Sequence, residues 1–280
     1  MKNNIILYNH FHNGDIFFAR MLINILIEKY DITFYHNLKT PLLNDIDGVN
    51  EINGIPEILP IHDNYLDKFL VNTWIGQKGM IYVSKINNGC TFENYVVLCK
   101  EISNFYSIEI GEVEDLIPDI NFQNLNGLDI IDDKLNSFGQ FKKRVLISNG
   151  PVLSQQSINF DFTEIINEIS NKHKDILFIV TEPINSHNIN VICSDVLTSA
   201  KPDLLYISYI STKCDIIIGR ASGPHTFARI KRNLMDSNKT FISFNHTYSE
   251  GKFYENQKSK FIWSNNYTYE NIINTINQNI

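Results

Sequence analysis

The residues best suited to bind a charged ligand follow an apolar run in the second half of the chain. Residues 214–218 are typical of a buried strand. A helix is predicted to begin directly behind Ser222, Gly223 and Pro224. The first backbone N–H groups of a helix have no partner within it, and its dipole favours negative charge. With the cationic side chain of Arg220 beside them, these groups predict an anion site; an ordinary strand-to-helix turn is an equally good explanation.

Residues that could move a proton follow the first apolar run, residues 4–9. The pKa of a histidine lies near neutral pH, and the pKa of a carboxylate rises in a partly dry cleft, so His12 or Asp15 could deprotonate a hydroxyl. Asn13 and Gly14 lie between them, and Gly14 allows a tight turn. The alternative is that Asp15 only caps the following helix and that His12 is a polar loop residue.

Two further predicted strands of the second half end in polar residues. Ser148, Asn149 and Gly150 follow one apolar run and could meet a phosphate, although turn chemistry explains them as well. Glu182 follows the next run and could accept hydrogen bonds from a ribose or sugar hydroxyl. A solvated loop carboxylate is the alternative for Glu182.

Positioning these residues together requires parallel strands, and strand-like runs do alternate with helix-like ones. The predicted strands are 4–9, 32–36, 57–61, 70–74, 144–148, 176–180, 190–193, 214–218, 240–244 and 261–263. The predicted helices are 16–30, 91–106, a helix through 162–169, 204–212 and 267–280. This alternation indicates an α/β protein with two Rossmann-like, doubly wound domains that face each other across a ligand-binding cleft.

The expected organisation has four parts. A first Rossmann-like domain covers residues 1–125, a polar, turn-rich linker covers 126–142, and a second Rossmann-like domain covers 143–265. A carboxyl-terminal helix covers 266–280, and packing of this helix back on the first domain is one arrangement considered.

Composition excludes several classes of protein. Hydrophobic residues make up 43% of the 280 residues and charged residues 20%, which is typical of a globular chain. The net charge of -7 argues against nucleic acid or an anionic membrane as the main partner, while peripheral membrane contact stays open. None of the four cysteines has metal-ligand spacing, so we expect reduced thiols in a cytoplasmic protein without a transmembrane segment.

Two of these segments carry a resemblance to a known family. Residues 218–228, Ile-Gly-Arg-Ala-Ser-Gly-Pro-His-Thr-Phe-Ala, resemble the D-S-G-P-x-H-x-A signature of the bacterial heptosyltransferase-like glycosyltransferases. Gly14-Asp15 resembles the G-D of that family's first domain. The chain departs from the signature at two positions: Ala221 stands in place of Asp, and Thr226 in place of His, with His225 one place earlier.

The resemblance implies a GT-B architecture and a metal-independent, inverting transfer of a sugar from a nucleotide-diphosphate donor. It implies Asp15 as the general base, with His12 as the alternative, and Asn13 and Gly14 as acceptor-side residues. The residues implied to bind the nucleotide sugar are Ser148, Asn149, Gly150, Glu182, Arg220, Ser222, Gly223, Pro224, His225 and Thr226. No cofactor is expected, and the acceptor would be a glycan, a lipid-linked molecule or a protein in glycan or surface polysaccharide synthesis.

Three other functions are compatible with the sequence. A GT-B-fold epimerase or hydrolase would use the same nucleotide-sugar site without an acceptor. A catalytically inactive protein would bind the nucleotide sugar and not turn it over, as the Ala221 departure suggests. A metal-dependent transferase would use the D-x-D pair Asp45 and Asp47.

Overall fold

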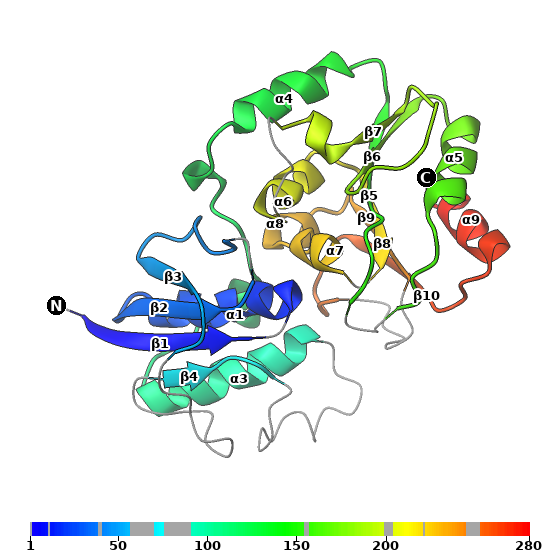
Figure 1. Ribbon diagram of the computed structural model, residues 1–280. Helices are drawn as coiled ribbons and strands as arrows, with labels where there is room; N and C mark the ends of the chain where they lie inside the picture. Colours follow the sequence, from blue (N-terminus) through cyan, green and yellow to red (C-terminus); the bar gives the residue numbers. More distant parts are fainter. Residues whose placement is uncertain are drawn as a thin grey trace. The chain divides into compact units, whose positions relative to one another are not determined.

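A computed structural model shows that the chain forms two compact units, Met1–Asn124 and Leu125–Ile280. Each unit contains its own parallel β-sheet with helices packed on it, which confirms the predicted α/β class with two Rossmann-like folds (Figure 1). The structure describes residues 2–10, 12–38, 41–56, 70–75, 91–153, 157–198, 204–220, 222–244 and 253–280.

The first unit is built on a four-stranded parallel sheet in the order β3-β2-β1-β4. Its strands are β1 (Asn3–Asn9), β2 (Tyr30–His36), β3 (Val49–Asn53) and β4 (Leu70–Asn72). Helices α1 (Asn13–Leu26) and α3 (Thr91–Tyr106) pack against each other beside it, and the short 3₁₀ turns η1 (Val113–Leu116) and η2 (Phe122–Asn124) follow. The predicted strand 57–61 lies outside the described residues.

The edge strand β3 is absent from the sequence-based prediction. Among the described residues it pairs only with β2. Its residues are half-buried or exposed, and Asn50, Glu51 and Asn53 interrupt any apolar run. An edge strand that buries so little surface leaves a weak hydrophobic pattern, so the pairing becomes visible only in the fold.

The second unit has a six-stranded parallel sheet in the order β10-β9-β8-β5-β6-β7. Its strands are β5 (Lys143–Ser148), β6 (Ile176–Val180), β7 (Val191–Cys193), β8 (Ile216–Arg220), β9 (Thr240–Phe244) and β10 (Lys260–Ser264). Its helices are α4 (Leu128–Ser137), α5 (Thr163–Lys172), η3 (Ser194–Val196), α6 (Leu204–Thr212), α7 (Gly223–Phe227), α8 (Lys231–Leu234) and α9 (Tyr269–Asn277). Numbered along the chain, the strands have the spatial order 3-2-1-4-5-6 of the Rossmann fold.

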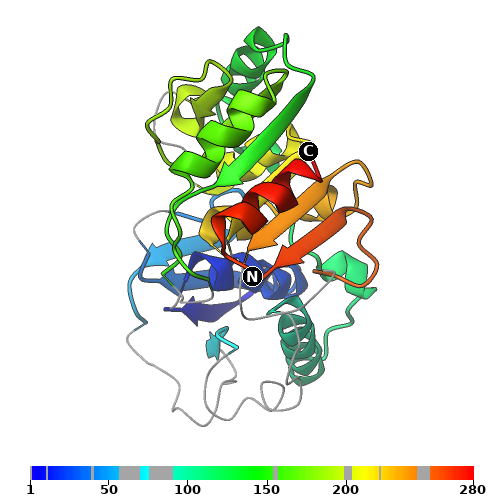
Figure 2. The same ribbon diagram turned by 90° about the vertical axis from the view of Figure 1, so that its right-hand side faces the viewer.

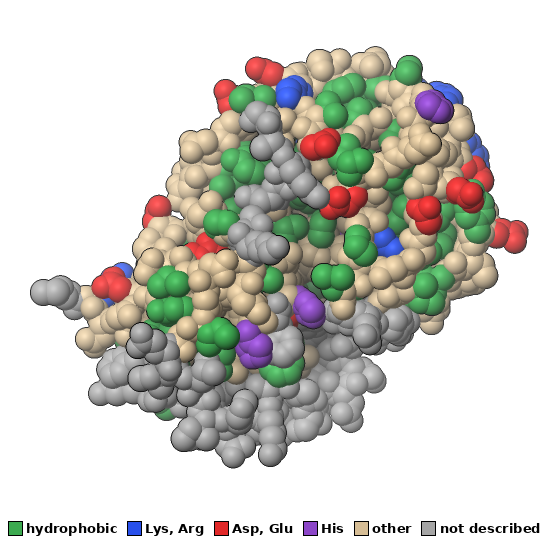
Figure 3. Space-filling model, viewed as in Figure 1, with side chains coloured by type: hydrophobic (Ala, Val, Ile, Leu, Met, Phe, Trp, Pro, Cys, Tyr) green, Lys and Arg blue, Asp and Glu red, His purple; other side chains and the backbone are tan. Residues whose placement is uncertain are grey.

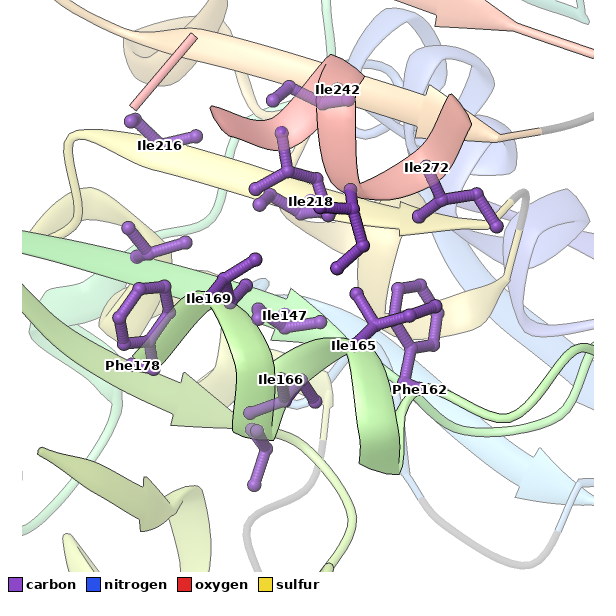
Figure 4. Close-up of a cluster of buried hydrophobic side chains, with 14 of the residues drawn as sticks. Ile147, Phe162, Ile165, Ile166, Ile169, Phe178, Ile216, Ile218, Ile242 and Ile272 are labelled. Carbon is purple, nitrogen blue, oxygen red and sulfur yellow. The ribbon is translucent and has the colours of Figure 1, made fainter. Parts of the chain in front are cut away.

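Alternate residues of these strands fill two separate cores. On one face, side chains such as Ile147, Phe178 and Ile218 pack against α5 and α9 (Figure 4). Figure 2 shows α5 in green and α9 in red side by side in front of the strands. On the other face, Leu146 and Leu177 pack against α4 and α6. Because both faces are covered, the strands read as continuous apolar runs, which is why the sequence reveals them.

The segment 126–142, predicted as a linker, contains the helix α4. Ile131 and Leu135 of this helix are fully or almost fully buried in the core that α6 also covers. The segment therefore belongs to the second unit. Only these two positions of α4 are buried, so its apolar stripe is narrow and the rest reads as polar and turn-rich.

The final helix closes the second unit. Ile272, Ile273 and Ile276 of α9 are buried in the same core as α5, so this helix packs within the second unit. A contact of the helix with the first domain stays a prediction. The capping of the helix is local, because the Thr268 side chain accepts a hydrogen bond from the Asn271 N–H.

Candidate functional site

The second sheet has a topological switch point between β5 and β8. The chain continues from β5 to β6 on one side, whereas β8 lies on the other side of β5. In such sheets ligands bind beyond the carboxyl ends of the two strands at the switch point. Ser148, the last residue of β5, pairs with Gly219 of β8, so the predicted residues after these two strands are brought together here.

Gly219 leaves room for two predicted site residues. A Cβ atom at this position would lie 2.8 Å from His225 Cδ2 and 2.9 Å from Ser148 Cβ, closer than side-chain atoms approach. The His225 ring also packs edge-on against Phe241, with 6.2 Å between the ring centroids. The imidazole and the serine therefore share the space above one glycine at the end of β8.

Ser148 Oγ, Ser222 Oγ and His225 Nε2 at this switch point are buried without a hydrogen-bond partner among the described residues, and Arg220 Nε is another such atom. Ser148 and His225 are 0% exposed, and Ser222 is 8% exposed. A buried polar atom without a partner costs about 1–3 kcal/mol, so a native protein rarely keeps several of them together without a use. Oxygen atoms of a bound ligand would supply the missing partners.

Ser222 is the N-cap of the short helix α7, although its side chain makes no capping hydrogen bond. Its carbonyl accepts the Thr226 N–H at 2.9 Å, and Pro224 occupies the first turn as predicted. The hydroxyl of Ser222 has no hydrogen-bond partner among the residues that the structure describes. Ala221, the departure from the family signature, lies outside the described residues.

Asn149 joins the end of β5 to the end of β6. Its Nδ2 donates to the Glu182 carbonyl at 2.8 Å, and its Oδ1 accepts the Glu182 N–H at 2.9 Å and the Thr181 hydroxyl at 3.2 Å. Gly150 follows, and a Cβ there would lie 3.3 Å from Glu182 Cγ. The carboxylate of Glu182, half-buried, is therefore held beside the loop that leaves β5.

Arg220 lies at the end of β8, as the sequence predicts, but its guanidinium has partners that the sequence does not predict. The side chain is 2% exposed, and its guanidinium donates to the carbonyls of Phe160, Asn149 and Gly150 at 2.7, 2.5 and 2.7 Å. It also lies 5.1 and 5.0 Å from the ring centres of Phe160 and Phe162. This geometry favours a role in holding the β5–α5 loop over the direct phosphate contact that was predicted.

We predict that Arg220→Met lowers the free energy of unfolding by about 2–3 kcal/mol, since buried carbonyls lose a charged hydrogen-bond donor while the apolar stem keeps its packing. Urea unfolding followed by circular dichroism measures this change. Arg232→Met is the matched control, because Arg232 is exposed on α8. A change below about 0.5 kcal/mol for Arg220→Met would contradict the loop-holding role.

In the first unit, the predicted proton-transfer residues lie in the first turn of α1. His12, which is exposed, is the N-cap, and Asp15 is the third residue of the helix rather than its cap, because α1 begins earlier than predicted. Asp15 Oδ2 accepts the His12 N–H at 3.3 Å. Burial raises the pKa of Asp15, and this hydrogen bond and the nearby His12 oppose the rise in part. Asn13 and Gly14, both half-buried, complete the turn.

A carboxylate with a raised pKa is suited to proton abstraction, because its conjugate acid is weaker than that of an exposed aspartate. Tyr95 of α3 contacts the backbone of Asp15, because its hydroxyl donates to the Asp15 carbonyl at 3.1 Å. The same contact fixes the backbone of Asp15 in place.

Asn9 and His10 come at the end of the first apolar run, but their contacts with the end of β4 were not predicted from the sequence. Asn9 Nδ2 donates to Thr73 Oγ1 at 3.1 Å, and the Thr73 N–H donates to the Tyr8 carbonyl at 3.0 Å, which joins the ends of these two strands. The rings of His10 and Trp74 lie 6.2 Å apart. The signal was available, because parallel strands end at one edge and a strand was predicted to end at Trp74.

Asp45, the first acid of the D-x-D pair, is engaged in a buried ion pair. Its Oδ1 and Oδ2 accept hydrogen bonds from Arg20 Nη2 and Nη1 at 2.6 and 2.9 Å, and Oδ2 also accepts the Asn121 N–H at 3.0 Å. Asp47 is exposed. Within the described ranges, no group of three or more His, Cys, Asp and Glu side chains could hold a metal ion.

On the face seen in Figure 3, Lys and Arg side chains lie singly among acidic and neutral ones, in keeping with the net charge of -7. In the parts of the chain that the structure describes, no helix has the length and apolar character needed to cross a bilayer.

Neither a protein-family model nor a curated protein matches this sequence. Solved structures do resemble it in fold. The crystal structure of a glycosyl transferase family 9 protein from Veillonella parvula has a TM-score of 0.51 at 9% identity, covering 100% of this chain and 92% of that one.

A second similar structure is the E. coli heptosyltransferase WaaC with ADP. It has a TM-score of 0.57 at 7% identity and covers 99% of this chain and 97% of that one. The crystal structure of a UDP-N-acetylglucosamine 2-epimerase has a TM-score of 0.41 at 10% identity. Because both stronger matches extend over nearly the whole of each chain, this protein has the two-unit GT-B fold of those glycosyltransferase structures.

Proposed function

We propose that this protein is a glycosyltransferase that moves a sugar from a nucleotide-diphosphate donor to an acceptor hydroxyl. The single observation that carries the proposal is the set of buried groups of Ser148, Ser222 and His225 that lack partners among the described residues, at the switch point of a 3-2-1-4-5-6 sheet. The fold likeness to two glycosyltransferase structures supports it, and the ADP that accompanies the heptosyltransferase WaaC favours a nucleotide as the ligand of the second unit.

Sugar transfer from a nucleotide diphosphate requires hydrogen-bond donors at the leaving group. Breaking the bond between the anomeric carbon and the diphosphate leaves negative charge on the diphosphate oxygens, which preorganised N–H and O–H groups stabilise. The hydroxyls of Ser148 and Ser222 are held beyond β5 and β8, where these oxygens would bind. Glu182, at the end of β6, would accept a hydrogen bond from a ribose or sugar hydroxyl.

The first unit would supply the base. As the new bond forms between the acceptor oxygen and the anomeric carbon, Asp15 takes the proton of the acceptor hydroxyl, and His12 is the alternative base. Asn13 and Gly14 would contact the acceptor. The proposed transfer needs no metal ion, so full activity in the presence of a chelator is expected. The acceptor class and a cytoplasmic location stay predictions.

A thermal-shift screen with nucleotide sugars tests the proposal. A ligand present at about 100 times its dissociation constant stabilises the folded state by about 2.7 kcal/mol, which raises the Tm measurably. The double variant Ser148→Ala/Ser222→Ala should lose the ligand-induced rise while its own Tm stays equal or higher, because the hydroxyls it removes have no partners in the described part of the chain.

Ser237→Ala is the matched control, since Ser237 is exposed in a turn of the same unit. If no nucleotide sugar raises the Tm of the wild type, the proposal is wrong. Consumption of the nucleotide sugar without any acceptor would instead identify an epimerase or hydrolase, and binding without turnover would identify an inactive binding protein.

A further inference from the structure

His225 has two ring nitrogens in different situations. Nδ1 lies 3.0 Å from Arg229 Nη2, and Nε2 is buried with no hydrogen-bond partner in the described part of the chain. A guanidinium only donates hydrogen bonds, so Nδ1 must accept, and an accepting nitrogen carries no hydrogen. In a neutral imidazole the hydrogen is then on Nε2.

The surroundings keep the ring neutral. His225 is 0% exposed, and burial, followed by the positive charge of Arg229, lowers the pKa of His225 well below its ordinary value. The guanidinium of Arg229 is itself held 4.8 and 5.7 Å from the ring centres of Phe253 and Phe261. The partner of Nδ1 is therefore fixed in position as well as in charge.

The Nε2–H belongs to a ring that packs at Gly219. The neighbouring ring atom Cδ2 and the Cβ of Ser148 both lie within 3 Å of the Cβ position of Gly219, at the carboxyl end of β8. The serine hydroxyl and the imidazole N–H are thus two donors, unpaired within the described ranges, at one point of the switch region. Both are electrically neutral, and both can bind an oxygen.

We infer that Arg229 is a positioning residue that holds His225 in the tautomer with hydrogen on Nε2, so that this N–H donates to a diphosphate oxygen of the nucleotide. The diphosphate part of this inference rests on the proposed function, whereas the tautomer can be measured in the free protein. In this inference Arg229 affects the nucleotide through His225, and its Nη2 also lies 3.5 Å from Ser243 Oγ.

Nuclear magnetic resonance of protein labelled with ¹⁵N-histidine measures the tautomer. His225→Gln assigns the ring signals by their disappearance. At neutral pH, wild-type His225 should show a protonated Nε2 and an unprotonated Nδ1. A hydrogen on Nδ1, or on both nitrogens, would overturn the inference without any need for a ligand or a second variant.

The variants then test the role of Arg229. Arg229→Met should convert the single tautomer into a mixture and weaken ADP, GDP, UDP or CDP, whichever binds the wild type, by about 10- to 100-fold, and Arg229→Lys should restore part of both. Arg232→Met, at an exposed arginine nearby, should change neither. An unchanged tautomer in Arg229→Met would overturn the positioning role.

The ligand contact has its own readout. Addition of the bound nucleoside diphosphate should shift the Nε2–H resonance of His225, and binding without such a shift would overturn the contact. If none of the four nucleotides binds the wild type, the proposed function is wrong, and so is the contact between His225 and the diphosphate. The effect of Arg229 on the tautomer is tested separately, because it is measured in the free protein.

Discussion

Replacing Asp15 with Asn is expected to lower the turnover number by about 10²- to 10⁴-fold, the range that a positioned general base contributes. Asn keeps the size of the side chain and can still accept the His12 N–H, but it cannot take a proton. Sugar transfer measured at saturating nucleotide sugar and acceptor gives the turnover number. The dissociation constant of the nucleotide should stay within about threefold of wild type, because the proposed nucleotide site belongs to the second unit.

The stability of Asp15→Asn shows whether a loss of activity comes from loss of the base or from loss of the fold. Folding raises the pKa of Asp15, so its contribution to stability is present below the pKa of the unfolded chain and is lost as the pH rises through the raised value. At neutral pH the ionised group is thus a cost that Asn removes, and the Tm of Asp15→Asn should not fall below wild type. The wild-type rate should rise with pH through the raised pKa, as Asp15 loses its proton.

His12→Gln is the comparison for this experiment. If Asp15 is the base, this variant keeps most of the activity, because His12 is exposed at the N-cap of the same helix. A wild-type rate for Asp15→Asn, together with a large loss for His12→Gln, would transfer the role of general base to His12.

Replacing Asp45 with Asn is expected to destabilise the protein by about 3–5 kcal/mol, because it leaves the fully buried guanidinium of Arg20 without its charged partner. The carboxylate also accepts the Asn121 N–H, so the substitution weakens a contact between segments far apart in the sequence. Urea unfolding gives the free energy of unfolding, and activity per folded molecule should stay close to wild type.

Asp47→Asn provides a matched control two residues away. Asp47 is exposed, so the control should change the free energy of unfolding by less than about 0.5 kcal/mol. A metal-binding D-x-D pair would behave differently. Both variants would lose activity, neither would lose much stability, and the activity of the wild type would depend on added metal ion. That outcome would overturn the structural assignment of Asp45.

The fold was largely predictable because its strands are buried on both faces. Runs such as residues 176–180 and 240–244 are mostly apolar, and the structure places β6 and β9 over the same residues. Elements with less buried surface were not found. The edge strand β3 and the helix α4 each bury too few side chains for a clear local period, and their pairing depends on partners elsewhere in the unit.

The partners of the site residues were harder to predict than their location. Arg220 was predicted to face a phosphate because it follows a strand at a glycine-rich turn. In the fold its guanidinium donates to carbonyls of residues 60 to 71 positions away, which no local pattern encodes. His225 and Arg229 are only four residues apart in the sequence. The burial of His225, however, depends on residues from other parts of the chain.

The sequence by itself determined that two parallel α/β units form, and that polar residues such as Asp15, Ser148 and Ser222 follow their apolar strands. These properties depend on local hydrophobic pattern and on the rule that parallel strands end at one edge. Only the tertiary structure decided which polar atoms are already paired, as in the Nη atoms of Arg220 and the carboxylate of Asp45, and which remain unpaired within the described residues, as in Nε2 of His225. The reason is physical: hydrogen-bond partners and burial depend on segments that meet in space, and the residues next to a site residue in the sequence do not reveal those segments.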